Sequence, residues 1–241
     1  PGGSNTTPSW TVVGAGEAAC GSCHGLPPDP PHAQNSACAN CHGMVVSAGG
    51  GWTDASRHIT GVVDVSATAC NSCHGSTDNP APPLDTNGSS DTTVVTVGAH
   101  QVHLAASDWH RVVQCDDCHV VPTTVDAPGH LDASPAEVTW GSLPQSDGAA
   151  PSFDRTATTC DGVYCHGTTL AGPNAGGTVA RTPGWTTVDG SFSECGTTCH
   201  TNPPGGSHPA NDQCETCHAA VIAGFDAGNP AASTWTNANL H

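Results

Sequence analysis

The chain has 241 residues, a formal net charge of −17, four arginines and no lysine. Only 33 residues are Val, Leu, Ile or Phe and 49 are Gly or Pro, so side chains alone do not supply a hydrocarbon core. The acidic excess argues against nucleic acid and anionic membranes as partners, and no apolar run approaches the roughly 18 residues of a membrane-spanning helix.

Few segments are expected to be regular. In chain order, residues 76–93, 141–158 and 167–184 are rich in Gly, Pro, Ser and Thr, which predicts surface loops. Residues 99–121 lack Gly and Pro and are predicted to form a helix. We therefore expect mostly irregular coil with a few short helices and little or no regular sheet, built as a single elongated unit over residues 1–241.

The 14 cysteines form seven pairs, and a histidine directly follows the second cysteine of each pair. Five pairs have the spacing CxxCH: Cys20 and Cys23 with His24, Cys38 and Cys41 with His42, Cys70 and Cys73 with His74, Cys115 and Cys118 with His119, and Cys214 and Cys217 with His218. Two pairs have longer spacers: Cys160 and Cys165 with His166 read CDGVYCH, and Cys195 and Cys199 with His200 read CGTTCH.

Three kinds of chemistry compete for these cysteines. An even number is compatible with disulfides, and CxxC is compatible with zinc or a redox pair, but neither requires the following histidine. C-x-x-C-H is the attachment signature of c-type haem, in which two thiols bond the vinyl groups and the histidine ligates the iron. Seven covalently bound haem c groups are therefore expected, with these seven histidines as proximal ligands, and they would form the core that the aliphatic side chains do not.

Seven irons need seven further axial ligands, and eight histidines are left over: His32, His58, His100, His103, His110, His130, His208 and His241. The only methionine, Met44, lies two residues from His42 and is badly placed to reach the opposite face of that iron. Bis-His ligation of all seven haems is therefore predicted, with one histidine to spare. If residues 99–121 are helical, His100 and His103 can serve two haems that flank one helix. We assign His110 as the spare, with a distal role for it as the alternative, and the other seven as distal ligands.

Residues 10–58 and 185–241 form an internal repeat. The pattern W-x9-C-x2-3-CH-x2-PP-x3-H-x5-CxxCH starts at Trp10 and again at Trp185, and both copies later reach W-T-[DN]-A-[SN]-x-H. His32 therefore corresponds to His208, and His58 corresponds to His241. We expect the repeated tryptophans to pack against porphyrin faces, with electron relay as the alternative. Because the chain stops at His241, either the gene product is longer and was cleaved or His241 is a terminal ligand.

Several segments together resemble a known group. They are CDGVYCHG at Cys160–Gly167, GAHQVHL at Gly98–Leu104, CDDCHVVP at Cys115–Pro122, and GHLDASPAEVTW from Gly129, which is similar to RHITGVVDV at Arg57–Val65. Over nearly its whole length the chain resembles the multihaem c-type cytochromes with CxxxxCH…CxxCH repeats from metal-reducing bacteria. The resemblance implies that His58, His100, His103 and His130 are distal ligands, and that the protein is exported and transfers electrons at the outer surface. Some similar proteins polymerise into conductive filaments.

Electron conduction is the function that we expect. With seven haems in 241 residues the porphyrins must lie close together, and the protein supplies ligation, spacing and protection. A multihaem reductase, the minor alternative, needs an iron with an open position, whereas the eight leftover histidines can fill every sixth position. We therefore expect an electron-transfer protein and not an enzyme.

Assembly and location follow from charge and chemistry. Fourteen haem propionates would bring the formal charge to about −31, so copies would repel one another at low salt. We expect a homopolymeric filament in which divalent cations, or His241 bound to a haem of a neighbouring subunit, overcome this repulsion; a discrete soluble carrier is the alternative. Redox partners or extracellular acceptors complete the expected partners. Haem is attached outside the cytoplasmic membrane, so we expect export to the cell surface or the extracellular space, with the periplasm as second choice. The start PGGSNTTPSW is not a signal peptide, and a signal could have been removed before it.

Overall fold

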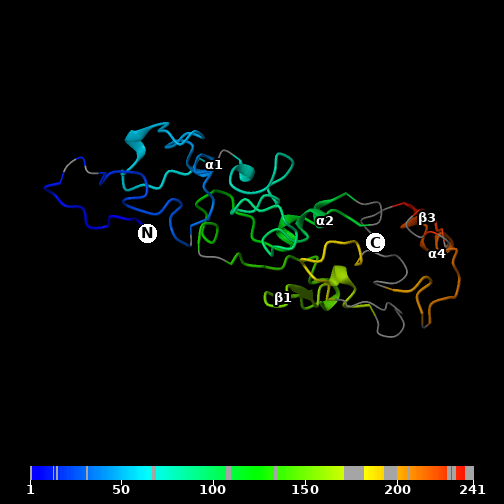
Figure 1. The fold of residues 1–241 in the computed structure, drawn as a ribbon. Helices are drawn as coiled ribbons and strands as arrows, with labels where there is room; N and C mark the ends of the chain where they lie inside the picture. The colour runs from blue at the N-terminus through cyan, green and yellow to red at the C-terminus, as the bar shows by residue number, and fades with distance from the viewer. Residues whose placement is uncertain are drawn as a thin grey trace. The chain divides into compact units, whose positions relative to one another are not determined.

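The computed structural model describes residues 2–12, 14, 16–30, 32–66, 69–106, 110–132, 135–170, 182–192, 200–205, 207–226, 229 and 232–236. Most of these residues form turns, bends and irregular coil between very short elements (Figure 1). The described elements are α1 (Ala39–His42), η1 (Ala55–Arg57), η2 (Cys70–Ser72), α2 (His100–Leu104), η3 (Cys115–Asp117), η4 (Ser146–Gly148), β1 (Ser152–Asp154), β2 (Thr159–Asp161), η5 (Tyr164–His166), α4 (Glu215–His218), β3 (Ile222–Gly224) and β4 (Thr234–Trp235), where η denotes a 3₁₀ helix. The predicted class, mostly coil with a few short helices, is confirmed. No helix in this part of the chain is long and apolar enough to cross a bilayer.

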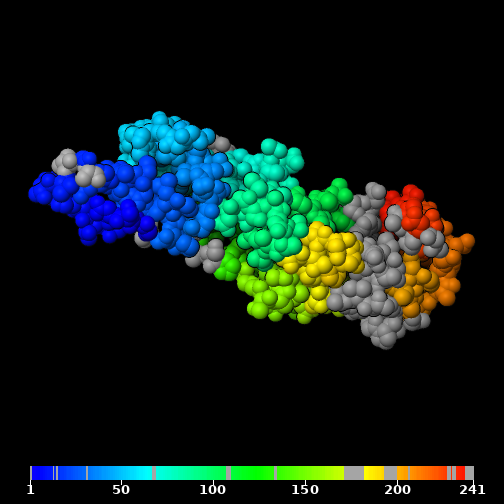
Figure 2. Space-filling model, viewed as in Figure 1, coloured from blue at the N-terminus to red at the C-terminus, as the bar shows by residue number. Residues whose placement is uncertain are grey.

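The chain divides into two compact units. Unit 1 comprises Pro1–Asp91 and Pro122–Ala136, and unit 2 comprises Thr92–Val121 and Glu137–His241. Each copy of the internal repeat falls within one unit, residues 10–58 in unit 1 and residues 185–241 in unit 2. Within unit 2, Figure 2 shows the yellow residues 182–192 packed against the green residues that surround α2. The expectation of a single unit over residues 1–241 stays a prediction.

Four of the five CxxCH motifs form short helical turns, namely α1, η2, η3 and α4. In α1 the amide of His42 donates to the carbonyl of Cys38 at 2.8 Å, and the amide of His119 donates to the carbonyl of Cys115 at 2.9 Å. One helical turn brings positions i, i+3 and i+4 to one face. Each such turn therefore presents both thiols and the imidazole together.

The longer spacer after Cys160 changes this local structure. Cys160 lies on β2, whereas the turn η5 begins only at Tyr164. Gly162 between them has a φ of +65°, a left-handed conformation that glycine adopts at little cost, and a Cβ there would overlap the carbonyl oxygen of Ala150. The extra residues thus connect β2 to the turn η5, which carries His166.

The predicted helix over residues 99–121 is wrong in its length. α2 ends at Leu104, Ala105 is extended with a ψ of 139°, and the amide of Val113 donates to the carbonyl of His103 at 3.1 Å. The chain therefore turns back along the helix, and His110 lies outside it. The absence of Gly and Pro did not reveal this end of the helix, because it depends on the pairing of Val113 with His103.

Two small antiparallel sheets occur in the described chain. β1 pairs with β2, with Phe153 opposite Cys160, so part of the predicted loop over residues 141–158 is a strand. The carboxylate of Asp154 accepts the amides of Thr156 and Ala157 at 2.8 and 3.0 Å and sets the turn between them. The second sheet pairs β3 with β4. Strands of two or three residues are too short for apolar alternation to predict them. Residues 76–93 contain no helix or strand, as expected, while much of the predicted loop over 167–184 lies outside the described residues.

Few apolar side chains are buried, and two of them lie within or just after a motif. In the described chain they are Val45, Ala81, Val97, Val163 and Ile222. Val45 follows His42 by three residues, and Val163 lies between the two cysteines of its motif. Other apolar side chains, such as Ile59 at 87 % and Val63 at 80 % exposure, remain open to solvent. Val45 and Val163 are therefore buried next to a cysteine–histidine motif, whereas other apolar side chains are not covered.

Candidate functional site

Histidines fall into two sets that the fold brings together. The seven that follow a cysteine pair are called motif histidines, and the other eight are called surplus histidines. Six motif histidines each lie opposite one surplus histidine, with ring centroids 6.1–6.4 Å apart. The pairs are His24–His58, His42–His32, His74–His130, His119–His100, His166–His103 and His218–His208.

The separation within these pairs matches that of two ligands on one metal ion. An imidazole nitrogen binds a metal at about 2.0 Å and its ring centroid lies about 1.1 Å further away, so two imidazoles on opposite sides of one ion have centroids about 6.2 Å apart. The six separations span 0.3 Å, although the angles between ring planes range from 11° to 83°. When rings pack directly on one another, their separation changes with orientation. A separation that is independent of ring orientation fits ligands that share a central atom.

The hydrogen bonds of the histidines determine which nitrogen each ring offers. In eleven histidines Nδ1 lies 2.5–2.8 Å from a backbone carbonyl oxygen: His24, His32, His42, His74, His100, His103, His110, His119, His130, His200 and His208. A carbonyl only accepts, so Nδ1 carries the proton and Nε2 keeps a free lone pair. Metal-binding histidines are commonly oriented by such a bond. The chain thus prepares Nε2 of these rings for ligation.

His166 differs from this pattern. Its Nδ1 is buried without a hydrogen-bond partner, and burial together with the nearby His103 lowers the pKa of His166 to about 4. The ring is therefore neutral at ordinary pH, which is the form that binds a metal. The buried, unsatisfied imidazole sits in the motif with the longest spacer.

One helix serves two of the pairs. His100 and His103 both lie on α2, one turn apart, and pair with His119 and His166 respectively. The prediction that these two histidines lie on one helix agrees with their positions, and their service to two haems that flank it stays a prediction. The thiols of the two motifs also lie near one another: burial, with the charges of Cys160, Asp117 and Cys165 adding to it, raises the pKa of Cys118 to about 12.

A second pair of motifs meets in unit 1. The thiol of Cys41 forms a hydrogen bond with that of Cys73, and burial, together with this contact, raises the pKa of Cys41 to about 12. All twelve cysteines in the described part of the chain are free thiols. Within that same part, no group of three or more His, Cys, Asp or Glu side chains is placed to hold a metal ion by itself. The protein atoms therefore provide pairs of axial nitrogens and adjacent thiols.

The predicted attachment cysteines differ in how far the protein covers them. The half-buried ones among the described residues are Cys38, Cys41, Cys73, Cys118, Cys160 and Cys214, and the exposed ones are Cys20, Cys23, Cys70, Cys115, Cys165 and Cys217.

The thiols of Cys23 and Cys217 are open to solvent. In the first motif both Cys20 and Cys23 are exposed, and in the last motif Cys217 is exposed together with the adjoining His218. Protein atoms alone therefore do not enclose these positions, and attachment of haem to Cys23 and Cys217 stays a prediction.

Arginine supports two of the sites, a role that the motif analysis missed. The guanidinium of Arg57, next to His58, lies 3.2 Å from the carboxylate of Asp64, and the backbone carbonyl of Asp64 accepts Nδ1–H of His42 at 2.7 Å. Arg111 donates to both carboxylate oxygens of the buried Asp117 at 2.9 and 2.8 Å. The sequence did carry a signal for this role: with four arginines and no lysine against 21 acidic residues, each arginine is a rare partner for a carboxylate.

The tryptophans contact histidine rings in two places. Trp185 lies against both His100 and His103, with centroid separations of 4.7 and 5.8 Å. Trp52 lies 4.7 Å from His58. Trp10, the repeat equivalent of Trp185, is 97 % exposed.

One predicted site lies partly outside the described residues. Cys195, Cys199 and His241 are not described, whereas His200 is, with its Nδ1 bonded to the carbonyl of Thr201 at 2.8 Å. His110 is half-buried and is not part of the six pairs above; its assignment as the spare stays a prediction. The repeat supplies the expected partner of His200, since His24 pairs with His58 in the first copy.

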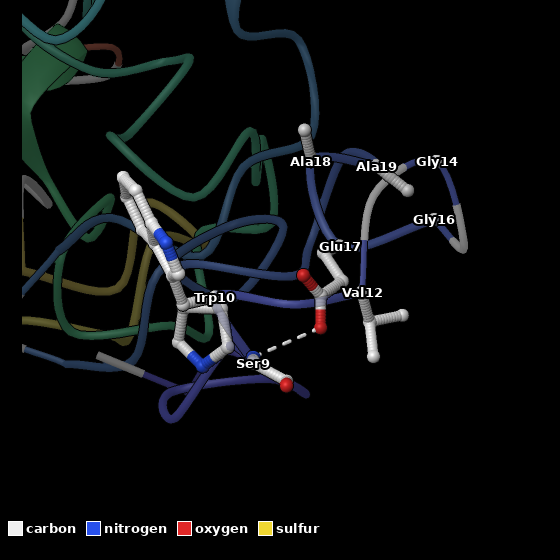
Figure 3. Close-up of a pocket in the computed structure, with 9 residues that line it drawn as sticks. Ser9, Trp10, Val12, Gly14, Gly16, Glu17, Ala18 and Ala19 are labelled. Carbon is white, nitrogen blue, oxygen red and sulfur yellow. Dashed lines mark hydrogen bonds between the residues drawn. The ribbon is translucent and has the colours of Figure 1, made fainter.

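A hollow of about 720 Å³ lies just before the first motif (Figure 3). It is lined by residues between Pro8 and Ala19, and the amide of Ser9 donates to the carboxylate of Glu17 at 3.1 Å across it. Trp10 lies on the opposite side of this loop from Gly14 and Gly16. The lining of the hollow contains no histidine or cysteine, so the hollow does not coincide with any of the histidine pairs.

Comparisons with protein-family models, with curated proteins and with solved structures found no match to this chain.

Proposed function

We propose that this chain is a c-type cytochrome that binds seven bis-His haems and conducts electrons along them as the subunit of an extracellular filament. One observation carries the proposal: six histidine pairs, each made of one motif histidine and one surplus histidine, have the separation of two ligands on one iron. Ring packing alone gives no reason for each pair to contain one member of each set.

The residues fit haem in their chemistry as well as in their spacing. The cysteines before each motif histidine would hold the porphyrin by thioether bonds, and the paired imidazoles would bind its iron from both faces. Backbone carbonyls fix the ring planes through Nδ1, as the bond from His119 to the carbonyl of Glu137 at 2.8 Å does. Haem, when bound, supplies a one-electron ferric/ferrous couple. The chain contributes ligation, orientation and exclusion of water.

Adjacent sites support conduction. The ligand positions on α2, His100 and His103, are about 4.5 Å apart along the helix axis. Cys118 lies near the thiols of the next motif, and Cys41 contacts Cys73. Porphyrins attached to these thiols would adjoin at their edges, and electron tunnelling is fast only over short distances.

Filled axial positions favour a conduit over a reductase. Six surplus histidines already lie opposite a motif histidine, and the repeat assigns His241 to His200. A reductase would need an iron position left open to substrate. We therefore propose electron transfer without catalysis at any of the seven irons.

The polymeric form rests on the repeat and on charge. Repeated units expose equivalent ends that can stack, and His241 at the end of the second copy would fill the position opposite His200 in a neighbouring subunit, so that every iron keeps two histidines. Self-repulsion of so acidic a chain would be overcome by this bond or by divalent cations. Because haem attachment takes place outside the cytoplasmic membrane, we propose that the protein is exported to the cell surface or beyond.

Haem content tests the cytochrome proposal. The protein, produced in a host with a haem-attachment system, is expected to show the intact mass of the chain plus seven haems and only low-spin ferric signals in its electron paramagnetic resonance (EPR) spectrum. A haem-free product with disulfides or zinc would overturn the proposal, and a high-spin, ligand-accessible haem in the wild type would revive the reductase.

Imaging tests the filament. Negative-stain micrographs with and without a divalent-cation chelator are expected to show filaments, and His241→Ala is expected to shorten or abolish them. Discrete particles under all conditions, with monomeric scattering, would favour the soluble carrier.

A further inference from the structure

The indole of Trp185 occupies a position between two ligand pairs of unit 2. Its ring lies against His103 with planes at 27° and meets His100 edge-on at 86°. Its Nε1–H donates to the carbonyl of Val95 at 2.7 Å, on the segment that leads into α2. A single side chain thus touches the surplus histidines of two successive sites.

The backbone ties the same residue to the motif of one of these sites. The amide of Trp185 donates to the carbonyl of Thr158 at 2.7 Å, and the amide of Cys160 donates to the carbonyl of Pro183 at 3.2 Å. The backbone of Trp185 is therefore held beside β2, which carries Cys160, while its indole lies against His103, the histidine opposite His166. The strand and the histidine together set the position of Trp185.

α2 needs such support because it is short. A helix of five residues is marginal on its own, and within it the imidazoles of His100 and His103 are held by bonds from Nδ1 to the carbonyls of Val97 and Ala99. These bonds restrain each ring plane at Nδ1. The indole, which lies against His103 and meets His100 edge-on, adds a second restraint on each ring.

We propose that Trp185 is a positioning residue shared by two adjacent haems: it fixes the planes of His100 and His103 and thereby the angles of 25° and 52° that these rings make with His119 and His166. The inference rests on the proposed haem ligation and extends it. The angle between axial imidazole planes controls the g-anisotropy of a low-spin ferric haem, and ligand orientation tunes its potential. Trp185 therefore sets the properties of two haems together.

The chain offers a second way to move the indole and a matched control. Gly98 is buried with a φ of +43°, and a Cβ there would overlap the Trp185 indole, so Gly98→Ala displaces the ring without removing it. Trp10 has the same place in the repeat but is 97 % exposed. Trp10→Ala thus removes an equivalent indole without touching a described ligand pair.

The experiment compares the EPR spectra and redox titrations of the oxidised holoproteins carrying Trp185→Ala, Trp185→Phe, Gly98→Ala and Trp10→Ala. Two of the seven low-spin signals are expected to shift in Trp185→Ala, the same two in Gly98→Ala, less in Trp185→Phe, and none in Trp10→Ala. The potentials of the same two haems are expected to move.

Two results would overturn the inference while leaving the cytochrome intact. One is a Trp185→Ala protein with seven haems, reduced thermal stability and unchanged signals, since the indole would then only stabilise the fold. The other is an EPR spectrum of Trp10→Ala in which the low-spin signals shift as much as they do in Trp185→Ala. If Trp185→Ala fails to mature, Trp185→Phe and Gly98→Ala decide the matter by the same criteria. A wild-type protein without haem would overturn both this inference and the proposed function.

Discussion

Arg57 and Asp64 connect two neighbouring histidine pairs. Arg57 precedes His58, the partner of His24, and its guanidinium lies 3.2 Å from the carboxylate of Asp64. The backbone carbonyl of Asp64 accepts Nδ1–H of His42, the motif histidine of the next site. An ion pair with one end at each site thus fixes the segment between them.

This ion pair should contribute measurably to stability. Arg57 is 42 % exposed and Asp64 is 17 % exposed, so solvent screens part of the attraction, and a double-mutant cycle of Arg57→Gln with Asp64→Asn is expected to give a coupling of about 0.5–1 kcal/mol in the free energy of unfolding. The matched control is the cycle with Asp54→Asn, since Asp54 lies 3.4 Å from Arg57 but is 46 % exposed, and its coupling is expected to be smaller. Denaturant unfolding of the holoprotein measures both; a larger coupling to Asp54 would contradict the ranking.

Removal of one surplus histidine should open one iron. In the His103→Ala holoprotein, one of the seven haems loses its sixth ligand and is expected to give a high-spin ferric signal, because His166 then binds the iron alone. His110→Ala is the matched control from the next segment and is expected to leave every haem low-spin. A high-spin signal in His110→Ala would show that His110 is a ligand and not the spare.

The turn at Gly162 should be sensitive to any side chain. Gly162→Ala places a Cβ against the carbonyl oxygen of Ala150 and also strains a φ of +65°, so it is expected to cost about 2 kcal/mol or more of unfolding free energy and to lower occupancy of the His166 site. Gly148→Ala is the control, because Gly148 has a φ of +77° with nothing within 4 Å of the added Cβ, and it is expected to cost about 1 kcal/mol. Thermal unfolding and haem content of both variants test the difference. Equal effects would mean that backbone conformation alone matters.

The chain should not fold without its cofactor. Val, Leu, Ile and Phe are too few to offset the conformational entropy of 241 ordered residues, so apoprotein made without a haem-attachment system is expected to give a far-ultraviolet circular dichroism spectrum of disordered chain. The holoprotein serves as the control. A compact apo form with the same spectrum as the holoprotein would show that the polypeptide holds itself together.

Much of the candidate site could be predicted because its signals are local. A motif such as Cys38–His42 places two thiols and an imidazole within one helical turn, and the structure forms that turn as α1. The pair His100 and His103 could be read from helical spacing for the same reason. The helix itself was predicted too long, because its end at Leu104 depends on the chain turning back to the carbonyl of His103. Local spacing also does not say how far a thiol is covered, and Cys23 and Cys217 are exposed.

By itself, the sequence determined the seven motifs, the two sets of histidines, the internal repeat and the scarcity of apolar side chains. Only the tertiary structure decided which surplus histidine lies opposite which motif histidine. His74 and His130 are 56 residues apart, and the segment Pro122–Ala136 belongs to unit 1 although the residues on either side of it belong to unit 2. Irregular chain carries no periodicity from which such pairing could be read. It is set by non-local hydrogen bonds, such as that from His119 to Glu137, and by single contacts such as that of Trp185 with α2.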